Sequence, residues 1–155
     1  MNIRRVHMAD IHVIWDMEKR IFGRHAFNMS ALLWGAIGNK KGFFVADGDD
    51  GLVGYLIARP APDEVSCWEI ASIAVREESR GQGVGTRLIE EFVEFARQRG
   101  AGRVALEVSV LNPRAQSLYR RLGFAASNVI PSYYGPDEDG VKMVLDVAGV
   151  KGGKE

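Results

Sequence analysis

The sequence predicts a mixed α/β domain in which about four helices flank a mostly antiparallel sheet of about seven strands. Three observations support this fold class: strand and helix patterns alternate along the chain, an early segment has the pattern of a β-hairpin, and two strand patterns close the chain. A length of 155 residues suits one domain with one core. We expect that domain to cover residues 1–148, and residues 149–155, which hold little to bury, to form a flexible tail.

The first elements are a short strand and two helices. Residues 3–6 have a strand pattern, and the helix after them carries apolar side chains near the 3.6-residue period. These side chains are Ile11, Ile14, Trp15, Ile21 and Phe22. Glu18 breaks the apolar stripe, and we expect its carboxylate at the solvated edge of the helix. Ser30 is predicted to cap a second, short helix, because a serine hydroxyl can accept a hydrogen bond from a first-turn N–H.

A β-hairpin and a further strand come next. Residues 43–46 and 52–58 have strand patterns, and the segment 47–51 between them has the Asp and Gly content of a tight turn. Pro60 and Pro62 are expected to end the second strand. Residues 68–75 are rich in branched side chains and predict another strand of the sheet.

The second half of the chain predicts two more helices and three strands. An amphipathic helix pattern begins at Val84, and Gly100 is its expected C-terminal stop. Asn112 is predicted to cap the last helix, which has Pro113 in its first position and ends at Gly123. Three strands are predicted around these helices, over residues 104–110, 125–130 and 141–147. The loop between the last two of these strands is expected to hold an aromatic pair, Tyr133 and Tyr134.

Charge, hydropathy and cysteine content exclude several classes of protein. Lys and Arg number 20 and Asp and Glu number 20, so no net field favours nucleic acid or an anionic membrane. No apolar run approaches the ~20 residues that a membrane-spanning helix needs, and Asp10 and His12 interrupt any signal-peptide core. Cys67 is the only cysteine, which excludes an internal disulfide and suits a buried side chain in a reducing cytoplasm. We therefore expect a cytoplasmic protein without a metal, since His7, His12 and His25 lack zinc-site spacing.

The segment Arg80-Gly81-Gln82-Gly83-Val84-Gly85-Thr86 lies between a predicted strand and a predicted helix. Glycines let backbone N–H groups approach an anion, and a helix N-terminus adds a favourable dipole, so pyrophosphate is a natural occupant. A P-loop would need Lys and then Ser or Thr after the last glycine, where Thr86-Arg87 stands. The dinucleotide fingerprint would need Gly or Ala at position 86 or 88, where Thr and Leu stand. A glycine-rich turn without a ligand is the alternative that this segment alone leaves open.

The same segment resembles the Arg/Gln-x-x-Gly-x-Gly/Ala motif of the GNAT superfamily of N-acetyltransferases. Further blocks in the same order are similar to that superfamily, and the tail block is similar to N-terminal protein acetyltransferases of the bacterial RimI type and of the archaeal and eukaryotic types. These blocks are Met1-Asn2-Ile3-Arg4, Val53-Gly54-Tyr55, Leu106-Glu107-Val108, Asn112, Ala115, Leu118-Tyr119, Leu122-Gly123-Phe124, Tyr133-Tyr134, Glu138-Asp139 and Met143. The resemblance extends over residues 3–147, and the order of its blocks makes it specific.

The resemblance implies the GNAT fold and acetyl-CoA as the acyl donor, attacked directly by an amine. It implies that a bulged strand pairs with the pantetheine arm and that a backbone N–H near Val75 meets the oxyanion. The residues that it places against acetyl-CoA are Ile73, Ala74, Val75, Arg80, Gly81, Gln82, Gly83, Val84, Gly85, Thr86 and Asn112.

The resemblance also implies a general base and a general acid. Glu107 is a carboxylate in an otherwise apolar strand, which by pattern alone fits a catalytic group or an exposed strand edge, and the family places a base there. The family places the Tyr119 hydroxyl beside the thioester sulfur as an acid, whereas the residue pattern alone also fits a half-buried aromatic. Glu69 is a second candidate for the base, with a salt bridge or a solvated side chain as its alternative.

On the acceptor side, the resemblance implies that five residues line the substrate: His25, Phe27, Glu69, Tyr133 and Tyr134. Eukaryotic-type relatives carry a catalytic glutamate near His25, and this chain departs from them there and looks more like the bacterial type. The implied acceptor is a protein or peptide N-terminus. A small amine such as a polyamine or aminoglycoside is the alternative, and a non-catalytic acyl-CoA-binding subunit is a third. Ribosome association and oligomerisation stay open.

Overall fold

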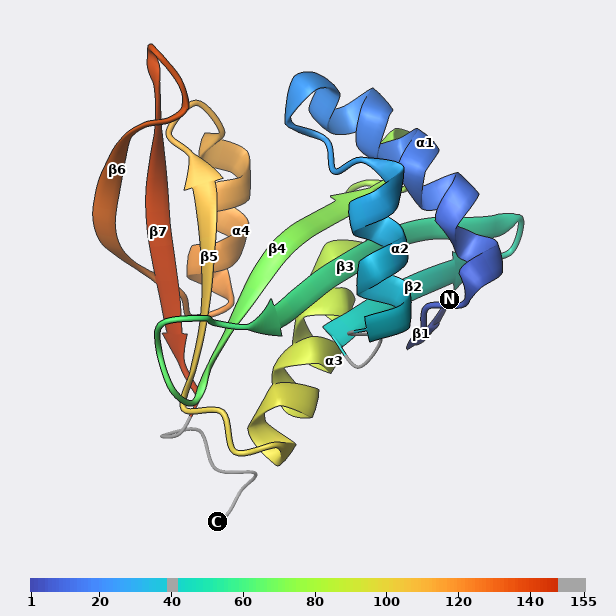
Figure 1. The fold of residues 1–155 in the computed structure, drawn as a ribbon, viewed down its shortest axis with the longest axis horizontal. Helices are drawn as coiled ribbons and strands as arrows, with labels where there is room; N and C mark the ends of the chain where they lie inside the picture. The colour runs from blue at the N-terminus through green and yellow to red at the C-terminus, as the bar shows by residue number, and fades with distance from the viewer. Residues whose placement is uncertain (39–41, 148–155) are drawn as a thin grey trace. The chain divides into compact units, whose positions relative to one another are not determined.

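The computed structural model describes residues 1–38 and 42–147. Within them, the chain forms seven strands and four α-helices (Figure 1). The strands are β1 (Asn2–Arg5), β2 (Phe43–Gly48), β3 (Gly51–Pro60), β4 (Cys67–Val75), β5 (Arg103–Ser109), β6 (Ala125–Gly135) and β7 (Glu138–Asp146). The helices are α1 (Ile11–Phe22), α2 (Met29–Gly38), α3 (Val84–Gln98) and α4 (Pro113–Arg121). The predicted tail, 149–155, lies outside the described residues.

The strands form one hydrogen-bonded sheet in the order β1-β2-β3-β4-β5-β7-β6. The pairs β1–β2, β2–β3, β5–β7 and β6–β7 are antiparallel. In contrast, β4 pairs with β5 in parallel, from Cys67 opposite Arg103 to Ile70 opposite Leu106. The predicted fold class, a mixed and mostly antiparallel sheet with four helices, is therefore confirmed.

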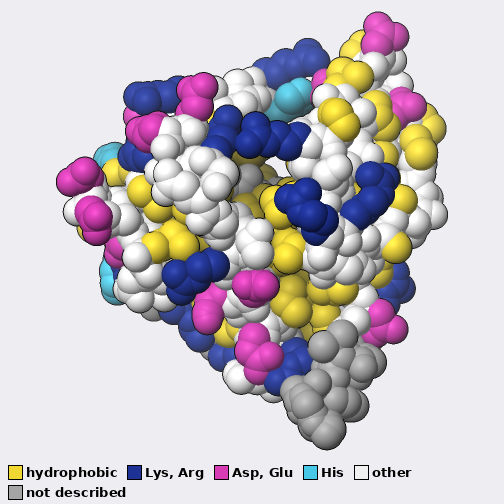
Figure 2. All heavy atoms as spheres, turned by 180° about the vertical axis from the view of Figure 1, so that it is seen from behind, with side chains coloured by type: hydrophobic (Ala, Val, Ile, Leu, Met, Phe, Trp, Pro, Cys, Tyr) yellow, Lys and Arg dark blue, Asp and Glu magenta, His cyan; other side chains and the backbone are white. Residues whose placement is uncertain are grey.

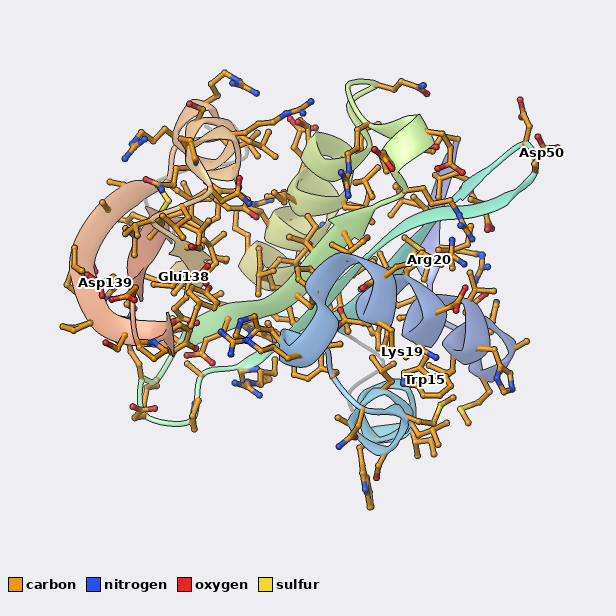
Figure 3. All side chains as sticks on the ribbon, turned by 90° about the horizontal axis from the view of Figure 1, so that it is seen from above. Trp15, Lys19, Arg20, Asp50, Glu138 and Asp139 are labelled. Atoms are coloured by element: carbon orange, nitrogen blue, oxygen red, sulfur yellow. The ribbon has the colours of Figure 1, made fainter. Side chains whose placement is uncertain are left out.

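The chain divides into two compact units, and the first comprises Met1–Arg59 with Ser72–Phe92. In this unit α1 and α2 lie over β2 and β3 (Figure 1). The apolar stripe of α1 faces the sheet, and the buried cluster between them includes Ile11, Ile14, Met17, Leu32, Phe43, Val45 and Tyr55. The Trp15 ring packs against this cluster, and the Lys19 ammonium lies 3.6 Å from the centroid of that ring (Figure 3).

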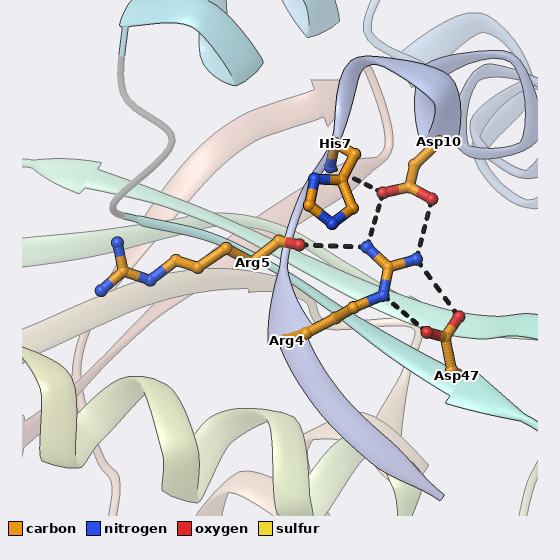
Figure 4. Close-up of polar contacts among 5 residues, drawn as sticks. All are labelled: Arg4, Arg5, His7, Asp10 and Asp47. Atoms are coloured by element: carbon orange, nitrogen blue, oxygen red, sulfur yellow. Dashed lines mark hydrogen bonds and ion pairs between the residues drawn. The ribbon is translucent and has the colours of Figure 1, made fainter.

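An ion-pair network ties the first strand to its neighbours in this unit (Figure 4). The Arg4 guanidinium donates to Asp10 at 2.9 and 3.0 Å and to Asp47 at 2.5 and 3.3 Å. Because Asp10 precedes α1 and Asp47 lies on β2, one side chain joins three elements. Asp10 also accepts the His7 N–H at 2.7 Å. Burial opposes ionisation of Asp10, but the hydrogen bonds and charge of Arg4 lower its pKa below the ordinary value.

The second unit comprises Pro60–Ala71 and the chain from Val93 onward. Here β5, β7 and β6 form an antiparallel sheet, and α4 contacts β5. The buried apolar side chains of this unit include Val104, Leu106, Phe124, Val141 and Met143. The prediction of a single domain over residues 1–148 stays a prediction.

Three local predictions were wrong. Glu18 does not lie at the solvated edge of α1: its side chain is only 1% exposed, because three hydrogen-bond donors satisfy it inside the fold. Ser30 does not cap α2, which begins at Met29. Asn28 takes that role, and its side-chain oxygen accepts the Ala31 N–H at 2.8 Å.

The aromatic pair Tyr133-Tyr134 lies in a strand and not in a loop. Strand β6 continues to Gly135 through an irregularity between Ile130 and Gly135, where Ser132 has a φ of 54°. The Asp139 carboxylate on β7 accepts the Ser132 N–H at 2.8 Å and so holds this irregular part of the strand.

Candidate functional site

The glycine-rich segment connects the end of β4 to the start of α3 in the first unit. Gly81 and Gly83 have φ values of 78° and 82°, in the left-handed region that favours glycine. An added Cβ at either position would meet no atom within 4 Å, so backbone conformation and not crowding calls for glycine. The Arg80 side chain donates to the Val75 carbonyl at 3.1 Å and ties this segment to the end of β4.

The start of α3 presents backbone donors directly after these glycines. The Arg87 N–H donates to the Gly83 carbonyl at 3.0 Å, as in the first turn of an α-helix. The N–H groups of Val84, Gly85 and Thr86 therefore precede the first intrahelical bond, and the helix dipole favours an anion beside them. An exposed turn, two left-handed glycines and three such N–H groups fit the pyrophosphate of a coenzyme A molecule.

The strand before this segment packs closely against β3 in the same unit. A Cβ at Gly54 would lie 2.9 Å from the Ala74 carbonyl oxygen, so only glycine allows this approach. Arg76 fixes the end of β4, because its N–H donates to the Val53 carbonyl at 2.8 Å and its Nε donates to the Leu52 carbonyl at 2.7 Å. The predicted bulge over Ile73–Val75 and the predicted oxyanion contact stay predictions.

A carboxylate and two phenols meet in the second unit. Glu107 on β5 is partly exposed, and its Oε1 accepts the Tyr133 hydroxyl at 3.3 Å. The Tyr133 ring contacts the Tyr134 ring edge to face, with 4.8 Å between centroids. Burial and then the charges around it, Glu107 among them, raise the pKa of Tyr134 well above the ordinary value. The structure thus brings together three of the residues proposed for the site, Glu107, Tyr133 and Tyr134, and their roles stay predictions.

Tyr119 lies on α4, and it is buried more deeply than the half-buried aromatic that the residue pattern allowed. Its side chain is 8% exposed, and its ring packs at 6.0 Å from the Phe124 ring. Burial raises the pKa of Tyr119 to about 12, so the phenol keeps its proton at neutral pH. Asn112 caps the same helix as predicted, since its Oδ1 accepts the Ala115 N–H at 3.1 Å.

Two further carboxylates hold the start of β7 near this group (Figure 3). Glu138 accepts the Ser109 hydroxyl at 2.6 Å, which joins β7 to the end of β5. Asp139 accepts the Ser132 N–H as described above. These contacts tie β7 to β5 and to β6, the strand that carries the aromatic pair.

The remaining predicted site residues lie in both units. Glu69 is partly exposed on β4, where it pairs with Ala105, two residues before Glu107 on β5. His25 is exposed and Phe27 partly buried in the connection between α1 and α2, in the first unit. The sequence interpretation missed Glu18 and Ser72, which bond to each other beside this connection. The available signal was the single charge on an otherwise apolar helix stripe.

Two features are absent from the part of the chain that the structure describes. Those residues contain no group of three or more His, Cys, Asp or Glu side chains arranged to hold a metal. None of the helices within residues 1–38 and 42–147 is both long and apolar enough to cross a membrane. Acidic and basic side chains both occur on the face shown in Figure 2, in agreement with the balanced composition.

Comparison with known proteins gives relatives over most of the chain. An uncharacterised N-acetyltransferase of Methanocaldococcus jannaschii is 29% identical over 155 residues, which cover 98% of this chain and 96% of that protein. An N-alpha-acetyltransferase of Sulfurisphaera tokodaii is 36% identical over 111 residues, 65% of this chain and 66% of that protein. A streptothricin acetyltransferase of Streptomyces lavendulae is 40% identical over 96 residues, 59% of this chain and 48% of that protein.

A solved structure shares the fold. The structure of Ard1 from Thermoplasma volcanium superposes with a TM-score of 0.85 at 23% identity and covers 94% of this chain and 96% of that one. The sequence profile of the Acetyltransferase (GNAT) family matches residues 9–124, which include the glycine-rich segment, Glu107 and Tyr119. With that match over most of its length, the chain belongs to the GNAT family of acetyl-CoA-dependent acetyltransferases.

Proposed function

We propose that this acetyltransferase acts on the α-amino group of a protein N-terminus. The observation that carries the proposal is the group in the second unit where the Tyr133 hydroxyl bonds Glu107 and the Tyr133 and Tyr134 rings meet. In such a group the carboxylate can accept a proton, and the two aromatic rings can pack against a peptide chain. The relative from Sulfurisphaera tokodaii, named an N-alpha-acetyltransferase, supports the same acceptor.

Glu107 is the proposed general base. A protein α-amino group has a pKa of about 8, so part of the acceptor carries an extra proton at neutral pH. Glu107 takes a proton from the amine, directly or through water, while the nitrogen forms its bond to the thioester carbon. Tyr133 holds the Glu107 carboxylate by its hydrogen bond. Glu69, on the strand that pairs with β5, is the second candidate for this role.

Tyr119 is the proposed general acid. When the carbon–sulfur bond breaks, the departing thiolate needs a proton. The buried phenol is protonated at neutral pH and can supply one. The proton lost by the amine goes to Glu107 and the proton gained by sulfur comes from Tyr119. The reaction balances when Glu107 then releases its proton to water and the Tyr119 phenolate regains one from water.

Acetyl-CoA supplies the activated acetyl group when it is bound. Residues 80–86 hold its pyrophosphate by the backbone donors at the start of α3. Ile73, Ala74, Val75 and Asn112 are proposed to bond the pantetheine arm. His25 and Phe27 in the first unit are proposed acceptor contacts, and so are Tyr133 and Tyr134 in the second.

A small-molecule amine is the second candidate acceptor, because the streptothricin acetyltransferase of Streptomyces lavendulae is also similar to this chain. That similarity is 40% identity over 59% of the chain, against 36% identity over 65% for the N-alpha-acetyltransferase of Sulfurisphaera tokodaii. A non-catalytic acyl-CoA-binding role is disfavoured, because the chain keeps both Glu107 and Tyr119.

A competition between acceptors tests the proposal. Purified protein is incubated with acetyl-CoA and equal amounts of peptides with varied first residues, the same peptides blocked at the N-terminus, a polyamine, an aminoglycoside and streptothricin. Mass spectrometry of the products should show acetylation of the free N-termini and not of the blocked peptides that keep a lysine. Faster acetylation of a small amine would replace the proposed acceptor by the second candidate.

A further inference from the structure

A buried carboxylate in the first unit takes no part in the chemistry proposed above. Glu18 lies on α1, and its side chain is 1% exposed in a helix face that is otherwise apolar. A carboxylate at that depth is unfavourable unless hydrogen-bond donors satisfy it. Its donors therefore indicate what the residue does.

Three donors from three elements converge on Glu18. Its Oε1 accepts the backbone N–H of Phe27 at 2.9 Å. Its Oε2 accepts the hydroxyl of Tyr55 and the hydroxyl of Ser72, each at 2.6 Å. These donors come from the α1–α2 connection, from β3 and from β4, so one side chain joins all three to α1.

The two hydroxyl donors hold the carboxylate in place. Tyr55 is fully buried, and burial followed by the charge of Glu18 raises the pKa of its phenol far above the ordinary value. Tyr55 therefore keeps its proton, and its hydroxyl donates a hydrogen bond to Glu18. With Oε2 occupied by two donors, Oε1 points at the Phe27 N–H in a fixed position.

The Phe27 bond lies in the middle of the α1–α2 connection. Gly23, with a φ of 55°, ends α1, and the Ala26 N–H donates to its carbonyl at 3.1 Å. Asn28 caps α2 on the other side. Between them, the Phe27 side chain packs against the buried cluster while its N–H donates to Glu18. The backbone that carries His25 and Phe27 is thus held from inside the fold.

The Ser72 bond connects the same carboxylate to the strand proposed for acetyl-CoA. Ser72 directly precedes Ile73–Val75 on β4. We propose that Glu18 is a positioning residue that sets the α1–α2 connection, and with it the acceptor, against this strand. The inference rests on the proposed function in one respect, that His25 and Phe27 flank the acceptor.

Hydrogen exchange tests the anchor without any catalytic assay. In Glu18→Ala, the Phe27 amide should exchange about tenfold faster than in the wild type, the loss expected for one hydrogen bond to a charged group. Glu18→Gln should restore most of the protection, because its amide oxygen can still accept the Phe27 N–H. Val45→Ala is the control, since it opens a cavity in the same core, opposite Tyr55 on the paired strand, and removes none of the three donors. Should Glu18→Ala fail to fold, Ser72→Ala removes one donor and should speed the exchange about threefold.

Steady-state kinetics tests the consequence, with whichever amine the wild type acetylates fastest. Glu18→Ala should raise the acceptor KM by about tenfold, and Ser72→Ala, used in its place, should raise it several-fold. In either variant the rise in acceptor KM should exceed the fall in kcat and the rise in the KM for acetyl-CoA. Glu18→Gln should restore the acceptor KM, and Val45→Ala should leave it near the wild-type value.

The outcomes separate this inference from the proposed function. Unchanged exchange at Phe27 overturns the anchor, and faster exchange with an unchanged acceptor KM overturns the positioning role. An equal rise in acceptor KM in Val45→Ala would assign the effect to stability alone. A wild type that prefers a small amine contradicts the proposed acceptor, and the KM for that amine then decides whether Glu18 positions it.

Discussion

The Glu107 carboxylate lies on β5 with the Tyr133 hydroxyl 3.3 Å from its Oε1, and the rings of Tyr133 and Tyr134 meet beside it. An amine that approaches the aromatic pair would therefore meet a group that can accept its proton. Because Glu107 is partly exposed, we expect its strength as a general base to depend more on its distance from the amine nitrogen than on burial.

Replacing Glu107 by Gln should lower kcat by about 100-fold or more, since the amide cannot take the proton of the amine. Raising the pH toward the pKa of the acceptor, about 8, should recover part of the rate, because the amine then arrives deprotonated. The affinity for acetyl-CoA should change little. The measurement is kcat against pH, with acetyl-CoA titrated separately by calorimetry. Equal activity of Glu107→Gln and wild type over the whole range would move the base to Glu69 or to a water molecule.

Replacing Tyr119 by Phe should also lower kcat, but higher pH should not restore it. The variant lacks the proton donor for the thiolate, and deprotonating the amine does nothing for the leaving group. The ring and its contact with Phe124 remain, so the variant should fold. The same kcat profile against pH checks this expectation, with the melting temperature as a control for folding. A variant at full rate would mean that the thiolate departs without an acid from the protein.

At the scale of elements, helix α3 has a matched pair of glycines at its two ends. Gly83 and Gly100 have φ values of 82° and 83°, and an added Cβ at either would meet nothing within 4 Å. Strain from a side chain should therefore be similar at both positions. The proposed pyrophosphate lies only at the N-terminal end, where the backbone N–H groups are.

Gly83→Val should thus lose acetyl-CoA binding, whereas Gly100→Val should keep it. Both variants should lose a similar free energy of unfolding, about 1–3 kcal/mol each. Calorimetric titration with acetyl-CoA measures the first difference, and urea unfolding measures the second. Normal binding by Gly83→Val would show that this segment does not hold the pyrophosphate. Loss of binding in both variants would assign the effect to the helix as a whole.

Sequence patterns located the elements because each depends on neighbours along the chain. The Asn112 cap, the proline at the first position of α4 and the hairpin between β2 and β3 all use contacts within a few residues. The choice of Asn28 over Ser30 as a cap could not be made this way. Both side chains can cap a helix, and the position of the connection after Phe27 decides between them.

Contacts distant in sequence could not be predicted from one chain. Glu18 bonds to residues 37 and 54 positions away, and helix periodicity does not show which groups face a given side chain across the core. The strand position of Tyr133 depends in the same way on Asp139 and on pairing with β7. Glu107 and Tyr119 could be predicted as site residues only because the order of motifs resembles a known family.

At the scale of the whole molecule, stability in acid depends on paired carboxylates. The pKa of Asp10 is below its ordinary value of 3.8 in the folded state, because Arg4 and the His7 N–H favour the ionised form. A lowered folded pKa contributes stability that is fully present above the ordinary value and is lost as the pH falls through the folded value. The Arg4 network should therefore stabilise the fold at neutral pH and fail in strong acid.

The test is the free energy of unfolding in urea for wild type and Asp10→Asn from pH 7 down to about 2.5. Wild type should be more stable at neutral pH, by a margin that stays constant to about pH 5 and shrinks steadily below it. Asp16→Asn is the matched control, because Asp16 pairs with Arg20 at 3.0 Å on the exposed side of α1, where a surface ion pair contributes little. It should follow the wild-type curve within about 0.5 kcal/mol at every pH. A margin for Asp10→Asn that does not narrow in acid would mean that the Asp10 side chain stabilises the fold by packing and hydrogen-bond shape, and that its charge contributes nothing.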